Sequence, residues 1–267
     1  MNTSSIVDPV TPLVLLQQKG AVAYLTLNRP AQYNALSEEM LAAVEAALDK
    51  VAADPVTRVV VLGGEGKAFC AGHDLKQMKS KPSVDYYRRL FADCSRLMMR
   101  IQSLPQPVIA RVHGIATAAG CQLVAMCDIA IAADEARFAV SGINVGLFCA
   151  TPSVALSRNV GRKAAFEMLV TGEMIDAAAA AQRGLINRCV PADRLDHEVS
   201  RIAAAIAAKP PSAVAAGKAL FYRQLESGLG AAYELAGEAM ACNMIESSAQ
   251  EGVAAFIEKR PPNWSTE

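Results

Sequence analysis

The segment HGIATAAGCQLVAMCD, residues 113–128, joins a run of small residues to a short apolar stretch. Ala118, Ala119 and Gly120 stand in succession, and Gln122 contributes the one side-chain amide of the segment. The strand-like sequence PVIARVHG leads into this segment, and the strand-like sequence DIAIAA follows its helical part. Two buried strands that enclose a helix require a crossover connection, so the segment predicts parallel strands in an α/β fold.

The rest of the chain divides into a mixed first part and a helical second part. LVLLQQKGAVAYLTLNRP predicts a hairpin that turns at Lys19 and Gly20, and Ser37 predicts the cap of a following helix. After about residue 150 the strands nearly stop and alanine-rich helical segments follow one another. The expected division is a core over residues 1–200, which includes the first of these helices, and a helical C-terminal region over residues 201–267.

The composition limits the classes of partner. The chain has 267 residues, of which 52% are apolar and 19% charged, and its formal net charge is +0. This balance predicts a well-packed core and argues against nucleic acid or an anionic membrane surface as a partner. The longest apolar region, residues 114–133, is interrupted by Gln122 and Asp128, which favours a buried helix and strand over a membrane span.

The sequence shows no targeting or metal signal. MNTSSIVDPVTPL, residues 1–13, has no basic start followed by an apolar stretch, so we expect no secretory signal. The seven cysteines are irregularly spaced without a CxxC pair, which favours reduced thiols and a cytoplasmic location. None of the three histidines has the spacing of a metal ligand set, so no metal is expected.

Two turns built from small residues each lead from a strand into a helix. They cover residues 70–75 and residues 114–120. The first amides of a helix lack an internal partner, and small side chains would let a ligand oxygen approach them. Two such turns facing one another would form an oxyanion hole. Close packing of strand and helix explains the same small residues, so the pattern alone leaves both interpretations open.

Several longer motifs together resemble the enoyl-CoA hydratase/isomerase (crotonase) superfamily. They are NRPAQYNAL, GKAFCAGHDLK, PVIARVHGIATAAGCQLVAMCDIAIAADEARFAV, GLINRCVP and EGVAAFIEKR, in this order along most of the chain. The resemblance implies a spiral of strand–strand–helix turns with a helical C-terminal region that forms homotrimers or hexamers. It also implies an acyl-CoA thioester as substrate, with coenzyme A arriving as part of it and no permanently bound cofactor.

The resemblance also implies roles for individual residues. The backbone amides of His73 and Ala119 would hold the enolate oxygen formed from the thioester carbonyl. Cys149 would border the acyl pocket, where an apolar wall is favoured over a reactive thiol because nothing basic stands beside it. Residues that would approach coenzyme A are Arg29, Gln32, Ala71, Asp74, Leu75 and Lys76, with a solvated surface charge as an equal interpretation for Arg29 and Lys76.

The sequence departs from the family pattern where hydratases carry two glutamates. Gln122 stands at the first position and Gly142 at the second. A glutamine can orient water but cannot accept a proton near neutral pH, and each missing acid or base costs about a hundred- to ten-thousand-fold in rate. Gly142 would leave space for a substrate carboxylate or a bicarbonate ion. The His73 imidazole is the candidate to replace the lost base, or else only its backbone amide takes part.

Three functions are compatible with the sequence. The first is a hydratase or isomerase of enoyl-CoA, a lyase-type enzyme of fatty acid or acyl-CoA metabolism with an altered proton relay. The second is a decarboxylase, or other enolate chemistry, on a malonyl-type CoA, which needs an oxyanion hole but no base. The third is a catalytically silent acyl-CoA binder. We take the first as the leading assignment and expect an acyl-CoA-binding member of the family.

Overall fold

The computed structural model describes residues 11–264 and begins with the predicted hairpin. Strands β1 (Val14–Lys19) and β2 (Val22–Leu27) pair antiparallel around Gly20, whose φ of +58° suits the turn. Helix α1 (Glu38–Ala53) follows, and the Ser37 side chain accepts a hydrogen bond from its third backbone amide, as the sequence predicts. Between β2 and α1 lies the 3-10 turn η1 (Pro30–Gln32).

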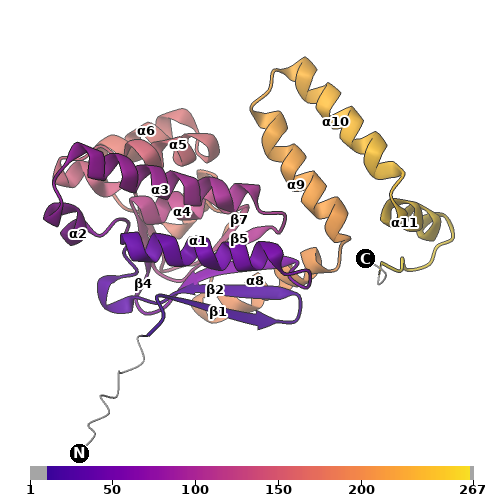
Figure 1. The fold of residues 1–267 in the computed structure, drawn as a ribbon, viewed down its shortest axis with the longest axis horizontal. Coiled ribbons are helices and arrows are strands. Elements are labelled where there is room, and N and C mark those ends of the chain that lie inside the picture. The colour runs from indigo at the N-terminus through magenta and orange to yellow at the C-terminus, as the bar shows by residue number, and fades with distance from the viewer. Residues whose placement is uncertain (1–10, 265–267) are drawn as a thin grey trace, which may run out of the picture.

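Two sheets organise the described chain. The larger has the strand order β1-β2-β3-β5-β7-β10, and its remaining members are β3 (Val59–Gly64), β5 (Val108–Val112), β7 (Ile129–Ala133) and β10 (Arg188–Val190). The smaller has the order β4-β6-β8-β9, with β4 (Ala68–Cys70), β6 (Ile115–Thr117), β8 (Arg137–Ala139) and β9 (Ile175–Asp176). Successive pairs, β3 with β4, β5 with β6 and β7 with β8, each place one strand in either sheet, which builds the predicted spiral of strand–strand–helix turns (Figure 1).

Helices cover both faces of the larger sheet. Besides α1, the helices of the described chain are α2 (Leu75–Ser80), α3 (Val84–Ser103), α4 (Ala119–Met126), α5 (Ala150–Asn159), α6 (Arg162–Thr171), α7 (Ala177–Gln182), α8 (Leu195–Ala207), α9 (Pro211–Leu225), α10 (Leu229–Met244) and α11 (Ser247–Ile257), with 3-10 turns η2 (Ser141–Val145) and η3 (Ala192–Arg194). The last three, α9 to α11, lie away from the sheet (Figure 1). Strand β3 shows that the two faces of the sheet belong to two separate cores. Val60 and Leu62 join the main core with α1, α3 and α4, whereas Val59 and Val61 join a second core beneath α8.

The structure adds three details to the sequence expectation. In the helical second part, residues 157–172 contain the end of α5 and the whole of α6, because the helix is interrupted at Val160 and Gly161. The smaller sheet was not predicted, since most of its strands are three residues long and show no alternation. The expected boundary after residue 200 falls inside α8, which packs on the larger sheet, and the chain leaves that sheet at Pro211.

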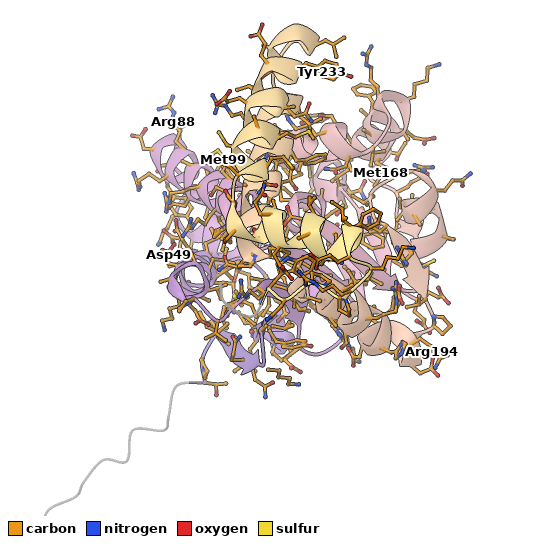
Figure 2. The ribbon with its side chains drawn as sticks, turned by 90° about the vertical axis from the view of Figure 1, so that its right-hand side faces the viewer. Asp49, Arg88, Met99, Met168, Arg194 and Tyr233 are labelled. Carbon is orange, nitrogen blue, oxygen red and sulfur yellow. The ribbon has the colours of Figure 1, made fainter. Side chains whose placement is uncertain are left out.

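The helices α9, α10 and α11 form an arm that projects from the rest of the molecule (Figure 1). Large apolar side chains remain exposed along it, including Tyr233 at 73% and Phe256 at 85%. Tyr233 stands near the far end of α10 (Figure 2). Large exposed apolar patches are typical of interaction surfaces.

A buried group of polar residues, here called the Lys218 cluster, joins the arm to the core. The Lys218 ammonium group donates to the carbonyl oxygens of Ile101 and Gln106 and to the Asp128 carboxylate, at 2.9, 3.0 and 2.7 Å. The Tyr222 hydroxyl donates to the other Asp128 oxygen at 2.7 Å. Burial lowers the pKa of Lys218, and the Asp128 carboxylate opposes that shift.

Among residues 11–264 no helix is long and apolar enough to cross a membrane. In the same part of the chain, no group of three or more histidine, cysteine, aspartate or glutamate side chains could hold a metal ion. Residues 1–13, in which no secretory signal is expected, lie mostly outside the described residues.

Candidate functional site

The turn between β4 and α2 leaves one backbone amide without a partner. Gly72 has a φ of +88°, and its carbonyl oxygen accepts a hydrogen bond from the Leu36 amide at 2.8 Å. The Asp74 amide donates to the Leu36 carbonyl at 3.2 Å. In this parallel pairing the residue between them turns its own N–H away from the partner strand. The His73 amide therefore faces the opposite side, where no described residue accepts its hydrogen bond.

The turn between β6 and α4 frees a second amide. Ala118 has φ +50° and ψ −121°, a strained backbone conformation for alanine that costs about 1–3 kcal/mol. The Ala118 amide donates to the Ala139 carbonyl at 2.9 Å, which fixes the turn to β8. Ala119 is the first residue of α4, and its amide has no hydrogen-bond acceptor in the described chain.

The two turns touch, which explains their small residues. A Cβ atom on Gly72 would lie 2.9 Å from the Ala118 Cβ and 3.2 Å from the Ala119 nitrogen. A Cβ atom on Gly120 would lie 2.1 Å from the Cys70 carbonyl oxygen. Close packing therefore requires glycine at both positions, and it also brings the two turns with unpaired amides together. Two backbone N–H groups stabilise an oxyanion where both point at the same oxygen position.

A buried asparagine that the sequence analysis did not single out holds the first turn. Asn34 is 0% exposed, and its amide nitrogen donates to the carbonyl oxygens of Glu65 and Ala68 at 2.9 and 2.8 Å. Its side-chain oxygen accepts from the Arg29 backbone amide at 2.9 Å. The polar, proline-containing segment NRPAQYN signals a turn, but the sequence does not reveal which distant carbonyls its asparagine reaches.

A cavity of about 230 Å³ opens beside the two turns. Of the predicted site residues, the cavity is lined by Ala71, His73, Leu75, Ala119, Gly142 and Cys149. Its other lining residues are Met78, Phe91, Ala118, Ser141, Val145, Leu147, Phe148, Ala150, Thr151 and Pro152, none of which was predicted as a site residue. No lysine, arginine, aspartate or glutamate belongs to this set of described lining residues.

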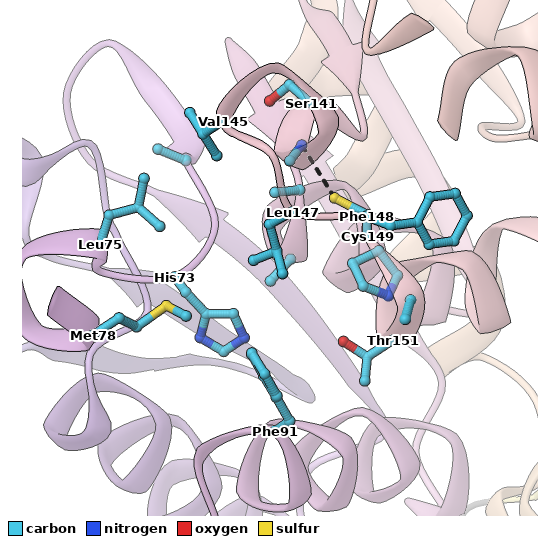
Figure 3. A pocket seen from close by; sticks show the side chains of 16 residues that line it. His73, Leu75, Met78, Phe91, Ser141, Val145, Leu147, Phe148, Cys149 and Thr151 are labelled. Carbon is cyan, nitrogen blue, oxygen red and sulfur yellow. Dashed lines mark hydrogen bonds between the residues drawn. The ribbon is translucent and has the colours of Figure 1, made fainter. Parts of the chain in front are cut away.

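The His73 imidazole forms one wall of the cavity together with Phe91 of α3 (Figure 3). The two rings meet edge to face with their centroids 5.5 Å apart. Both ring nitrogens are buried, and neither has a hydrogen-bond partner among the described residues. Burial lowers the pKa of His73, an effect that the nearby Leu36 carbonyl only partly opposes. The imidazole is accordingly neutral near neutral pH.

The opposite wall includes Gly142 and Cys149, which are hydrogen-bonded to each other. The Gly142 amide donates to the Cys149 sulfur at 3.2 Å (dashed line in Figure 3). A Cβ atom on Gly142 would lie 2.4 Å from the Leu147 carbonyl oxygen and 2.7 Å from the same sulfur. The direction of a side chain at residue 142 is therefore occupied by the loop itself, while the residue still lines the cavity. Burial raises the pKa of the Cys149 thiol, which keeps it protonated.

The remaining predicted residues lie outside the cavity lining. Arg29 pairs with Asp74 at 2.7 Å, and Asp74 also accepts from the first amides of α2. Although burial acts to raise the pKa of the Asp74 carboxyl, the hydrogen bonds from Arg29 and α2 outweigh it and lower that pKa. Gln32 and Lys76 are exposed. Gln122 is buried in α4, and its side-chain oxygen has no hydrogen-bond partner among the described residues.

Comparison with known proteins gives matches over almost the whole chain. The family model for enoyl-CoA hydratase/isomerase matches residues 17–267. A Xenopus laevis protein named enoyl-CoA hydratase domain-containing protein 3, mitochondrial, is 48% identical over 255 residues, which are 96% of this chain and 87% of that one. A putative enoyl-CoA hydratase of Thermus thermophilus is 37% identical over 250 residues, covering 92% of this chain and 98% of that one.

Two solved crystal structures have the same fold as this chain. The crystal structure of an enoyl-CoA hydratase from Mycobacterium smegmatis has a TM-score of 0.95 and 62% identity, and the match covers 96% of this chain and 100% of that one. The human enoyl-CoA hydratase domain-containing protein 3 has a TM-score of 0.92 and 45% identity, covering 94% of this chain and 100% of that one. These matches confirm the predicted α/β crotonase fold with its C-terminal helices.

Proposed function

The chain belongs to the enoyl-CoA hydratase/isomerase family, and we propose that it binds acyl-CoA thioesters and stabilises their enolates between the His73 and Ala119 amides. The observation that carries this proposal is the pair of unpartnered backbone amides on two touching turns beside an apolar cavity. A donor aimed at the developing oxyanion contributes about a hundred- to a thousand-fold in rate. The setting we propose is fatty acid or acyl-CoA metabolism.

The proton-transfer step is where this chain differs from a two-glutamate hydratase. No described lining residue is a carboxylate, so the proposed reaction proceeds without a carboxylate base in the cavity. Gln122 lies one turn beyond Ala119 on α4 with its side-chain oxygen unpaired, but it does not line the cavity. Its proposed role of orienting a water molecule in a hydratase-type reaction therefore requires a rearrangement that brings its amide to the cavity. The lack of a lining carboxylate equally supports the alternative of a catalytically silent acyl-CoA binder.

The decarboxylase alternative receives less support. A malonyl-type substrate brings a carboxylate into the cavity, and no described lining residue carries a positive charge to receive it. The position next to Gly142 is occupied by the Leu147 carbonyl oxygen and the Cys149 sulfur.

The test is mass spectrometry of acyl-CoA thioesters after incubation with the purified protein. The panel contains crotonyl-, longer 2-enoyl-, 3-enoyl-, malonyl- and methylmalonyl-CoA, with chromatography to separate isomers. The proposal predicts gain of water or double-bond migration on an enoyl-CoA, well above a protein-free control. Binding without turnover on any thioester identifies the silent binder. Loss of carbon dioxide identifies the decarboxylase, and absence of binding to every thioester refutes the proposal.

Assembly and location complete the proposal. We propose a homotrimer or hexamer built through residues 201–267, supported by the exposed apolar side chains along α9, α10 and α11. Light scattering coupled to size exclusion measures the mass, and a monomer at micromolar concentration refutes this assembly. A cytoplasmic location is also part of the proposal. The Xenopus relative is named as mitochondrial, so cell fractionation decides between the two compartments.

A further inference from the structure

The charge of the cavity restricts the acyl group that it accepts. Its described lining residues include no lysine, arginine, aspartate or glutamate. Most of the wall is apolar, with Leu75, Met78 and Phe91 near His73 and Leu147 and Phe148 across from them (Figure 3). A charged acyl substituent would lose its hydration here without gaining a partner of opposite charge. The uncharged lining of the cavity therefore favours an uncharged acyl chain.

Polar side chains in the cavity differ in whether they are already engaged. The Ser141 hydroxyl is paired with the Thr117 hydroxyl at 2.7 Å, and the Cys149 sulfur accepts the Gly142 amide. His73 and Thr151 also line the cavity, and neither side chain has a hydrogen-bond partner among the described residues. Of these two, only His73 has its polar atoms fully buried without a partner.

Leaving both nitrogens of a buried imidazole unpaired is unfavourable, because each loses its hydrogen bond to water. The Leu36 carbonyl is near the ring but forms no hydrogen bond with either nitrogen. A neutral imidazole offers one N–H donor and one acceptor nitrogen, the complement of a hydroxyl group, and its donor alone complements a ketone. Met78 lines the same wall, and its unbranched side chain can move to admit such a group.

We propose that the His73 imidazole is a specificity-determining residue that hydrogen-bonds a neutral oxygen, a hydroxyl or a ketone, carried by an uncharged acyl chain. This inference rests on the proposed function and names its substrate class. The His73 backbone amide holds the thioester oxygen, while the side chain of the same residue recognises a second oxygen further along the acyl group.

The test compares binding of acyl-CoAs of equal length by calorimetry. The ligands are hexanoyl-CoA, its 3-, 4- and 5-hydroxy derivatives, and adipyl-CoA, which ends in a carboxylate. In the wild-type protein one hydroxy isomer binds about two- to tenfold more tightly than hexanoyl-CoA, the contribution of one hydrogen bond. Adipyl-CoA binds at least about tenfold more weakly than hexanoyl-CoA.

The variants assign the effect to one residue. His73→Phe keeps the ring and the backbone amide, and it abolishes the preference for the hydroxy isomer while hexanoyl-CoA still binds. His73→Gln keeps a donor and an acceptor and restores part of the preference. Thr151→Val removes the other unpaired hydroxyl of the cavity and leaves the preference unchanged.

Three results overturn the inference: no hydroxy isomer binds better than hexanoyl-CoA, the preference survives in His73→Phe, or Thr151→Val removes it. If hexanoyl-CoA and the hydroxy isomers all fail to bind, the proposed function itself is wrong. Thermal unfolding of the free proteins adds a readout that needs no ligand. His73→Phe raises Tm if the nitrogens are unpaired, and a lower Tm shows that the imidazole serves the folded structure instead.

Discussion

The Lys218 cluster and the cavity beside the two turns are both buried and polar, yet they treat hydrogen bonding in opposite ways. In the cluster, Lys218 donates to three acceptors and both Asp128 oxygens accept. Beside the cavity, the His73 amide, the Ala119 amide and the His73 ring have no partner in the described chain. Complete pairing serves attachment of the arm, whereas incomplete pairing marks the place where a ligand supplies the missing partners.

Removing the ammonium group of the cluster tests the fully paired side of this comparison. Lys218→Met leaves the Asp128 carboxylate buried without its ion pair, so the free energy of unfolding falls by about 3–5 kcal/mol. Urea unfolding at one protein concentration measures the loss. Lys163→Met, on an exposed position of α6, changes stability by no more than about 0.5 kcal/mol. Equal stability of the two variants would show that the cluster does not anchor the arm.

Adding a methyl group where the two turns touch tests the role of the unpaired amides beside the cavity. A Cβ atom in Gly72→Ala meets the Ala118 side chain and the Thr117 carbonyl oxygen, at 2.9 and 3.1 Å, and moves the two amides apart. We expect turnover of the preferred thioester to fall by about a hundred- to a thousand-fold.

Gly20→Ala is the matched control for Gly72→Ala. Gly20 also has a positive φ, +58°, but no atom lies within 4 Å of its added Cβ. Gly20→Ala therefore has the same kind of backbone strain as Gly72→Ala but leaves the cavity intact. Turnover rates that match in the two variants would refute the role of the touching turns.

The loop opposite His73 is predicted to resist a side chain at residue 142. Gly142→Ala places a Cβ 2.4 Å from the Leu147 carbonyl oxygen, and the overpacking lowers the free energy of unfolding by about 1–3 kcal/mol. Gly217→Ala, within α9 and with no atom in 4 Å, raises stability by up to about 1 kcal/mol. Chemical denaturation measures both. A neutral Gly142→Ala would mean that the loop leaves room for the carboxylate expected from the sequence.

The smallest expected effect is on the pH dependence of stability. The folded state lowers the pKa of His73, so the unfolded chain binds a proton more readily as pH falls below the ordinary histidine value of 6.5. The contribution of the neutral ring is present above that pH and is lost as pH falls through the folded pKa. His113 shifts in the same direction, so His73→Phe weakens this acid sensitivity without abolishing it. An identical pH profile in the variant would contradict a buried, unpaired ring.

The sequence predicts the parts of the molecule that depend on local signals. Glycine at the hairpin turn, the Ser37 cap and the small residues around Ala119 each act within a few neighbours, and the structure contains all three features. Motif resemblance predicts the fold, which the comparisons confirm. The turn residues and Cys149 come together at one cavity, but the roles given to them stay predictions.

What the sequence could not give depends on contacts between distant segments. Asn34 reaches carbonyl oxygens more than thirty positions away, and nothing in its neighbourhood identifies them. The Gly142 amide donates to a sulfur seven positions later, and the sequence around Gly142 does not reveal that contact or the approach of the Leu147 carbonyl oxygen. The His73 ring likewise packs against Phe91, which belongs to a distant helix.

Infrared spectroscopy of a bound acyl-CoA tests the central claim most directly. Carbon-13 at the thioester carbonyl separates its stretching band from those of the protein, and saturating protein places every ligand molecule in the site. Two amide donors on the carbonyl oxygen weaken the double bond, so the band moves to lower wavenumber than in free acyl-CoA, and the shift shrinks in Gly72→Ala. A band at the free position, with binding confirmed on the same sample, would contradict an oxyanion hole formed by His73 and Ala119.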